Sequence, residues 1–316
     1  MGIAPRTILT PAVQRSSPAS PSPLGLPPEH TATPTWTPTP GPSPTPTALG
    51  GSAGGLVFHS GATGEQEIYR LNPAGGLPVN LTNTRGSDLT PRFSPDGRQI
   101  VFVSDRDGDL DIYLMNADGT NVVNLTRDDS LDDSPFWSPD GKFLVFSSDR
   151  DGNREIYRMR PDGSGALRLT ANLAFDITPA YSPDGQQIAF ASNRDGDMDL
   201  FLMDSQGGEV RLLTDIEGRD EFPSWSPDGS QIVFASDRTG NFELFRISAG
   251  GGIAENLTNS PAQDGSPAYS PDGTLAAFAS NRFGNYEIFI LDLTTLEVTR
   301  LTTNVDFDGD PSWGPG

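Results

Sequence analysis

The chain has 316 residues, a formal net charge of −21 and no cysteine. This negative charge opposes binding to nucleic acids and anionic membranes, and it favours basic protein surfaces and metal cations. The lack of cysteine excludes disulfides, thiolate metal ligands and a cysteine nucleophile. No apolar run approaches the length of a transmembrane helix, so we expect no membrane insertion.

Residues 1–50 are rich in proline, threonine and serine, and they hold 13 of the 29 prolines. Few apolar side chains are present there to offset the entropy of ordering, so we expect a disordered linker or tail ahead of a folded domain at 51–316. The first 30 residues lack the apolar core of a secretory signal. A proline-rich spacer before a β-domain is nevertheless typical of exported proteins. We therefore expect a periplasmic, extracellular or cell-surface location with a true start upstream, and a cytoplasmic protein is the alternative.

The rest of the chain is a tandem repeat with a period of 44 residues. Each unit holds four short runs of β-branched and aromatic residues, separated by turn sequences such as Ser-Pro-Asp-Gly. In the second unit these runs lie at 91–94, 100–104, 111–115 and 122–126. The pattern predicts a four-stranded antiparallel meander in every unit and almost no helix.

Aromatic residues recur at fixed places in the units and predict packing between neighbouring sheets. The second predicted strand carries a phenylalanine in each copy, at Phe58, Phe102, Phe146, Phe190, Phe234 and Phe278. A single four-stranded sheet cannot bury both of its faces, whereas sheets stacked radially can. These aromatic stripes therefore indicate a core rather than a ligand site.

The two ends of the repeat region complement each other. The first unit, from about Gly55, lacks a first strand, and the chain ends at 311–316 with a first strand that nothing follows. Pairing the two would leave no exposed sheet edge at the seam. The sequence thus predicts an all-β fold, a six-bladed β-propeller of four-stranded antiparallel blades whose C-terminal strand closes the first blade.

The repeated motifs Pro-x-Trp-Ser-Pro-Asp-Gly, Phe-x-Ser-Asp-Arg-x-Gly and Asp/Glu-Ile-Tyr-x-Met resemble the WD-like repeat of the TolB propeller family. The resemblance covers roughly residues 55–316 in all six copies. It implies a six-bladed propeller that serves as a protein-docking platform, often in the periplasm or outside the cell. TolB proteins carry an α/β domain ahead of the propeller. Here the proline-rich segment takes that place, so we expect a TolB-like propeller without the TolB N-terminal domain.

One aspartate per unit stands three residues before a proline, and these six repeated aspartates are the main candidate site. They are Asp88, Asp132, Asp176, Asp220, Asp264 and Asp308. They precede the innermost strand, so we expect them to rim the channel, contact a partner and offer a ring of oxygen ligands suited to Ca²⁺. The alternative is a structural Asx turn that positions the proline. The two roles are compatible.

The hairpin between the second and third strands is also acidic. Asp105, Asp107, Asp109 and Asp111 resemble a calcium loop only loosely, because its glycine is misplaced and its final glutamate is missing. We expect arginines to pair across this hairpin instead, in the pairs Arg106–Asp111, Arg150–Glu155, Arg194–Asp199, Arg238–Glu243 and Arg282–Glu287. The first unit has Ala62 in place of the arginine, so its hairpin should be the least ordered.

No catalytic constellation is visible, since the two histidines are His30 in the tail and His59 at a strand end. We therefore expect a non-catalytic, monomeric scaffold that presents an acidic channel face to a basic protein or peptide. It requires no cofactor, and Ca²⁺ is a candidate ligand. The alternative is a secreted hydrolase or lyase of polysaccharide or peptide with a channel metal. That enzyme would need unequal blades, for which Arg92, Phe136 and Phe222 are the only hints.

Overall fold

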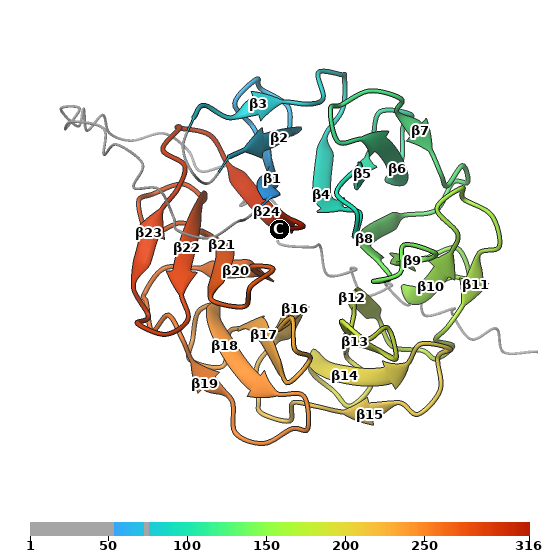
Figure 1. Cartoon of the computed structure of the whole chain (residues 1–316). Helices are drawn as coiled ribbons and strands as arrows, with labels where there is room; N and C mark the ends of the chain where they lie inside the picture. Colours follow the sequence, from blue (N-terminus) through green and yellow to red (C-terminus); the bar gives the residue numbers. More distant parts are fainter. Residues whose placement is uncertain (1–53, 73–75) are drawn as a thin grey trace, which may run out of the picture. The chain divides into compact units, whose positions relative to one another are not determined.

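The computed structural model describes residues 54–72 and 76–316. The chain divides into two units, Met1–Thr45 and Pro46–Gly316, and the described residues belong to the second. The predicted tail at 1–50 and His30 lie outside the described residues. Within them, all regular structure is β, in six four-stranded antiparallel sheets around a central axis (Figure 1). This confirms the predicted six-bladed propeller, and the described part holds no helix that could cross a membrane.

In every blade the three inner strands have five to seven residues and the outermost has two or three. Short outer strands leave little open edge for pairing with another chain. From the channel outward, the strands are β24 (Asp308–Gly314), β1 (Gly54–Ser60), β2 (Glu67–Leu71) and β3 (Val79–Asn80) in blade 1; β4 (Asp88–Phe93), β5 (Gln99–Ser104), β6 (Asp111–Asn116) and β7 (Val123–Asn124) in blade 2; β8 (Asp132–Trp137), β9 (Leu144–Ser148), β10 (Glu155–Met159) and β11 (Leu167–Arg168) in blade 3; β12 (Asp176–Tyr181), β13 (Gln187–Ser192), β14 (Asp199–Asp204) and β15 (Arg211–Leu212) in blade 4; β16 (Asp220–Trp225), β17 (Gln231–Ser236), β18 (Glu243–Ser248) and β19 (Glu255–Asn256) in blade 5; and β20 (Asp264–Tyr269), β21 (Leu275–Ser280), β22 (Glu287–Asp292) and β23 (Val298–Arg300) in blade 6.

The C-terminal strand β24 closes the ring. It pairs antiparallel with β1, from Asp308 opposite Ser60 to Gly314 opposite Gly54, and Figure 1 shows the two ends of the colour scale side by side in one blade. The indole Nε1 of Trp313 also donates a hydrogen bond of 3.0 Å to the carbonyl of Ala268 in blade 6. The predicted closure is confirmed.

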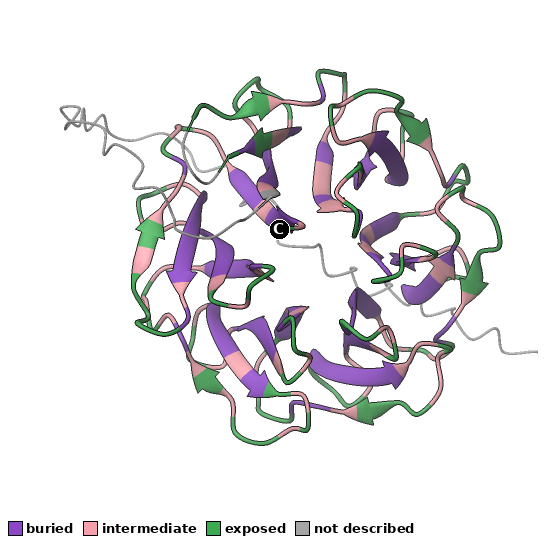
Figure 2. Cartoon of the chain, in the orientation of Figure 1, coloured by how far each residue is buried: buried purple, intermediate pink, exposed green. Residues whose placement is uncertain are grey.

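The core lies between the blades. The six second-strand phenylalanines are at most 1% exposed, and each contacts an aromatic ring of the adjacent third strand, as Phe190 does with Phe201 at a centroid distance of 5.9 Å. Figure 2 shows burial concentrated in the inner strands and exposure in the outer strands and loops. The aromatic stripes are therefore sheet-to-sheet packing, as predicted.

Each innermost strand is interrupted by a β-bulge just before its proline. The residue before this proline has a positive φ of 47° to 57° in every blade, at Thr90, Ser134, Thr178, Phe222, Ser266 and Asp310. This backbone conformation is strained for residues other than glycine, and bulges re-aim side chains near functional sites. The strain is repeated around the inner ring of strands.

Candidate binding site

The six repeated aspartates are fully buried at the start of the innermost strands. Five of them pair with an arginine, in the pairs Asp88–Arg106, Asp132–Arg150, Asp176–Arg194, Asp220–Arg238 and Asp264–Arg282, at 2.7–2.9 Å. None lines the central cavity. The expectation that they rim the channel and offer free carboxylates there is therefore wrong, because all six are buried and five are paired with arginine.

The arginine of each pair is fixed by three kinds of contact. In blade 4, Arg194 donates to both carboxylate oxygens of Asp176 at 2.9 Å and from Nε to the Ser192 hydroxyl at 2.9 Å. Its guanidinium lies over the rings of Phe190 and Phe201, at 5.1 and 4.8 Å from their centroids. Stacking and forked pairing together suit arginine and not lysine.

The predicted arginine pairs across the hairpin are therefore wrong. The acids at the start of the third strand bind a threonine that follows the fourth strand instead: Asp111 accepts a hydrogen bond of 2.9 Å from the Thr126 hydroxyl, and Glu155 accepts one of 2.6 Å from the Thr170 hydroxyl. The arginine side chain folds back and donates to the serine two residues before it, as Arg106 does to Ser104. Ser104 pairs across the sheet with Asp88, so the guanidinium reaches that aspartate. The Asx-turn alternative also fails for the repeated aspartates, since they bind arginine and serine side chains.

Blade 1 departs from this arrangement. Ala62 takes the arginine position, so Asp308 is buried without a cation and is held by Asn304, whose Nδ2 lies 2.6 Å from Oδ2, and by Ser60. Burial raises the pKa of Asp308 to about 6. The carboxylate on the closing strand is thus the least compensated of the six.

The folded protein should be more stable at pH 5 than at pH 8, with a melting temperature higher on the order of 5 °C. Burial raises the pKa of Asp199 and of Glu221 to about 7, and that of Asp308 to about 6. Each folded-state pKa lies above its value in an unfolded chain, so the folded state binds these protons more tightly. Stability is therefore gained as the pH falls through 7 toward 4. Thermal unfolding across this range measures it.

Restoring the missing arginine provides the control. The Ala62→Arg variant should raise the melting temperature at pH 8 by about 2–4 °C, the effect of about 1 kcal/mol in a domain of this size, and should reduce the pH dependence. In the Asp308→Asn background the same arginine should bring no gain. A wild-type melting temperature that falls from pH 8 to pH 5 would contradict the assignment.

The described residues contain no set of metal ligands at the predicted calcium sites. Among residues 54–72 and 76–316, no three histidine or acidic side chains converge in a group that could hold a metal ion. In the hairpin of blade 2, Asp105 accepts a hydrogen bond from the Ser87 amide, and Asp107 accepts one from the Tyr113 hydroxyl. These acidic groups are occupied by separate protein donors.

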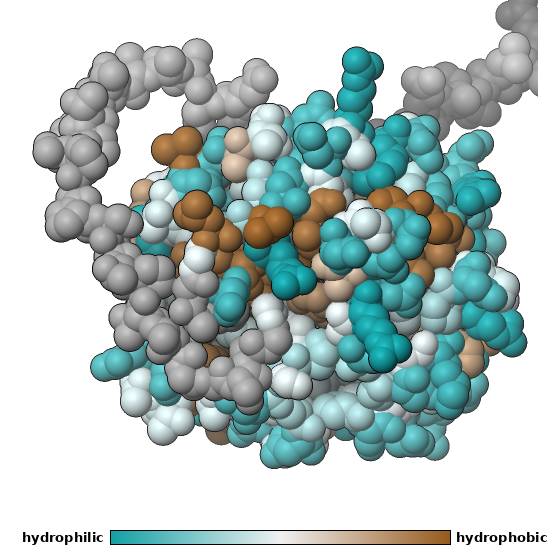
Figure 3. Space-filling model, turned by 45° about the horizontal axis from the view of Figure 1, so that its top comes forward, coloured by the Kyte–Doolittle hydropathy of each residue, from teal (hydrophilic) through white to brown (hydrophobic). Residues whose placement is uncertain are grey.

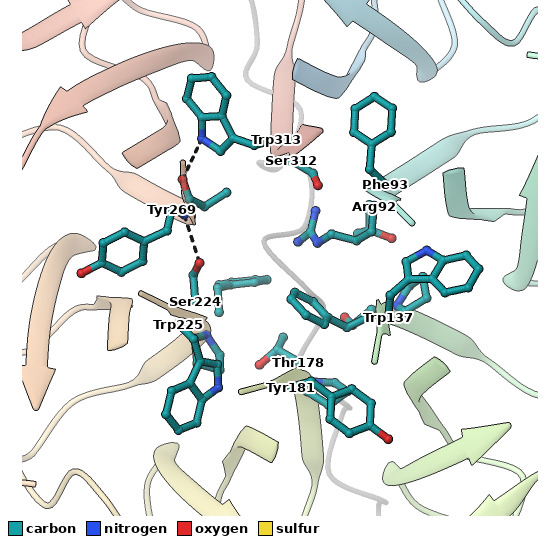
Figure 4. A pocket seen from close by; sticks show the side chains of 18 of the residues that line it. Arg92, Phe93, Trp137, Thr178, Tyr181, Ser224, Trp225, Tyr269, Ser312 and Trp313 are labelled. Atoms are coloured by element: carbon teal, nitrogen blue, oxygen red, sulfur yellow. Dashed lines mark hydrogen bonds between the residues drawn. The ribbon is translucent and has the colours of Figure 1, made fainter. Parts of the chain in front are cut away.

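A cavity of about 290 Å³ lies on the propeller axis. It is lined by the innermost strands and by the Ser-Pro-Asp-Gly loops that follow them, through residues such as Pro95, Pro139 and Pro183. The cavity therefore opens at the end of the innermost strands, opposite the end where the repeated aspartates lie. Figure 4 shows the side chains that converge on it from successive blades.

A second set of aspartates lies in the Ser-Pro-Asp-Gly loops at this end of the propeller, and three of them directly follow the lining residues Pro95, Pro139 and Pro183. These rim aspartates are Asp96, Asp140, Asp184, Asp228 and Asp272, and all five are exposed. Each accepts a hydrogen bond from the serine two residues earlier and from the backbone amide two residues later, as Asp228 does from Ser226 at 2.6 Å and Ser230 at 3.0 Å. Each of them is the aspartate of a Ser-Pro-Asp-Gly motif, and from the sequence we interpreted that motif only as a turn.

The rim aspartates stay charged well into acid. The Ser226 hydroxyl, followed by the Ser230 amide, lowers the pKa of Asp228 to about 2. The pKa of Asp140 is also lowered to about 2, chiefly by Lys142 and then by Ser138. The pKa values of Asp96, Asp184 and Asp272 are lowered in the same direction by their serines. Five carboxylates are thus available to solvent beside one opening.

Inside the cavity the sixfold repeat is broken. The residue after the bulge proline is Arg92, Phe136, Ala180, Ser224, Ala268 or Ser312, according to the blade. Arg92 and Asp310 are the charged residues among those that line the cavity, and Figure 4 shows the Arg92 side chain extended into the opening. These positions therefore differ from blade to blade, unlike the repeated aspartates and second-strand phenylalanines.

Sequence comparison agrees with this fold. The family model of the TolB beta propeller domain matches residues 63–176 and 172–264, which is more than half of the chain. The chain belongs to the TolB β-propeller family. A curated relative, the Protein TolB homolog of Chlorobium chlorochromatii (strain CaD3), is 51% identical over 37 residues, which make up 12% of this chain and 8% of the relative. The chain thus matches less than a tenth of that relative's length.

Solved structures of the same fold include a TolB protein and an enzyme. TolB from Acinetobacter baumannii is similar with a TM-score of 0.75 and 25% identity, over 83% of this chain and 67% of that chain. An oligogalacturonate lyase in complex with manganese is similar with a TM-score of 0.58 and 16% identity, over 79% of this chain and 74% of that chain. The second likeness extends to the fold alone.

Proposed function

We propose that this TolB-like propeller is a non-catalytic binding domain that receives a basic protein or peptide at the mouth of its central cavity. The observation that carries the proposal is the set of five exposed rim aspartates beside that mouth, with pKa values lowered by local hydrogen bonds. Family membership supports a protein partner. The proposal needs no cofactor and places the protein outside the cytoplasm, in the periplasm or at the cell surface.

The acidic interaction surface proposed here is the opposite face from the one predicted. Its carboxylates are exposed, whereas the repeated aspartates are buried and paired with arginine. The rim loops carry five aspartates and two exposed cations, Lys142 and Arg98, so their charge is predominantly negative. A cationic partner gains from long-range steering toward such a surface, and that gain weakens as salt rises. Figure 3 shows hydrophilic residues over much of the visible surface, interrupted by a band of hydrophobic ones.

Panning a random peptide library against the protein should enrich basic peptides whose affinity depends on the rim. The triple variant Asp140→Asn, Asp184→Asn, Asp228→Asn should weaken their binding by about tenfold, because exposed charge pairs contribute up to about 1 kcal/mol each. Asparagine keeps the oxygen that caps each turn, so the loops should stay folded. Fluorescence anisotropy of one labelled peptide at low and high salt measures the effect.

A matched triple variant on the opposite loops removes the same charge. Asp129→Asn, Asp195→Asn and Asp215→Asn change exposed residues that lie between the fourth and first strands or in the outer hairpin. Binding should be unaffected apart from a small general loss at low salt. Equal losses in both triple variants, or enrichment of neutral peptides, would overturn the proposed surface.

A further inference from the structure

Arg92 is held in place and still has hydrogen-bond donors to spare. Its Nη1 donates to the carbonyl oxygens of Pro91, at 2.9 Å, and of Asp310, at 3.3 Å. Its Nε and Nη2 have no acceptor among the described residues, and no carboxylate there lies within ion-pair distance of it. Two donors of a half-buried guanidinium are therefore directed to the cavity that Figure 4 shows.

The nearest carboxylate is already engaged. Asp310 accepts a hydrogen bond of 2.6 Å from the Ser266 hydroxyl through Oδ1, and its Oδ2 lies 3.4 Å from Nδ1 of His59. His59 is itself buried, at 4% exposure. Asp310 is thus oriented away from a forked pair with Arg92. Burial lowers the pKa of the Arg92 guanidinium, as expected for a cation that leaves water without a bound anion.

Two phenylalanines, Phe136 and Phe222, supply apolar walls to the cavity, which serine and threonine residues also line. Phe222 comes from blade 5, which lies across the ring from blade 2, the blade of Arg92. Phe136 comes from blade 3, which is next to blade 2. A volume of about 290 Å³ is at the lower end of the range for small-ligand sites. The cavity is therefore large enough for one apolar side chain with one anionic group, and too small for a longer stretch of a partner chain.

We propose that the cavity captures the C-terminal carboxylate of a peptide chain, with Arg92 as its anion-binding residue and Phe136 and Phe222 as the wall for an apolar last side chain. Arginine pairs with carboxylate through two parallel hydrogen bonds, which match its two free donors. The inference rests on the proposed function and specifies the partner: an apolar C-terminal residue in the cavity, preceded by basic residues that reach the rim aspartates.

The test uses N-acetyl-L-phenylalanine as a mimic of a peptide C-terminus, titrated into the full chain and followed by ligand-detected NMR. We expect saturable binding of the free acid and binding about tenfold weaker for its C-terminal amide, because a charged hydrogen-bond acceptor is lost. This comparison needs no variant. The Arg92→Gln variant should bind the acid as weakly as the wild type binds the amide, and Phe222→Ala should weaken both.

Arg98→Gln is the matched control, because it removes the same charge from a side chain on the same face that is 84% exposed. It should leave binding of the acid unchanged. Equal binding of acid and amide, or the absence of saturable binding, would overturn this inference. The proposed function is tested separately, by the triple variant of the rim aspartates. Tighter binding of D-galacturonate than of the peptide mimic would overturn it in favour of an acidic sugar.

Discussion

Replacing Arg194 with methionine should lower the free energy of unfolding by about 3–5 kcal/mol, the usual cost of leaving one partner of a buried ion pair uncompensated. Asp176 is fully buried, and both of its oxygens accept from Arg194 at 2.9 Å. Methionine keeps much of the packing against Phe190 and Phe201 but supplies no donor. Urea denaturation at pH 7.5 measures the loss.

The double variant Arg194→Met, Asp176→Asn separates charge from packing. It removes the stranded carboxylate and should recover most of the lost stability, whereas Arg98→Met on the exposed rim should change stability by no more than about 0.5 kcal/mol. A loss below about 1 kcal/mol in the Arg194 variant would mean that solvent reaches Asp176 and that these pairs do not hold the blades together.

The fold was predictable because each blade repeats the same physical solution. Phe190 and its five equivalents could be placed in the core, since a small sheet must bury an aromatic stripe on both faces. The position of Trp313 followed from the two incomplete ends of the repeat. Both inferences depend on periodicity alone, and periodicity needs no knowledge of side-chain orientation.

The site was not predictable in the same way. Asp88 and Asp96 recur with the same period, and they lie at opposite ends of β4; no signal in the sequence says which end opens onto the cavity. The partner of Arg194 was equally ambiguous, because Asp176 and Asp199 are both within reach of a hairpin arginine. The bulge at Thr90 was unforeseen, since a β-branched residue rarely adopts positive φ.

Unequal residues carried more information than the repeated ones. Arg92, Phe136 and Phe222 were weak hints of asymmetry in the sequence, and all three line the cavity. The repeated aspartates, which the sequence made most conspicuous, are structural. In a symmetric array, selection for stability produces repetition, so a side chain found in one blade only is the better sign of ligand recognition.

Removing residues 308–316 should abolish the cooperative folding of the propeller. β24 supplies the innermost strand of blade 1, with five residue pairs to β1, and Trp313 packs with Leu56 and Phe58 between blades 1 and 6. Without it the chain exposes the edge of β1 and an apolar seam, which promote association between chains. Loss of the sharp thermal transition, with aggregation in gel filtration, is the expected result.

A synthetic peptide of residues 305–316, added in trans, should restore the transition, because it carries the backbone of β24, the Trp313 indole and the carboxylates of Asp308 and Asp310 that contact the rest of the propeller. The same peptide with Trp313→Ala should rescue poorly, since that substitution removes a buried aromatic side chain worth about 3–5 kcal/mol. The Asp308→Asn peptide should rescue at pH 8 at least as well as the native one, because its carboxylate is buried there without a cation. A truncated chain with the native melting temperature would show that blade 1 stays closed without β24, and the ring geometry on which the cavity depends would have to be abandoned.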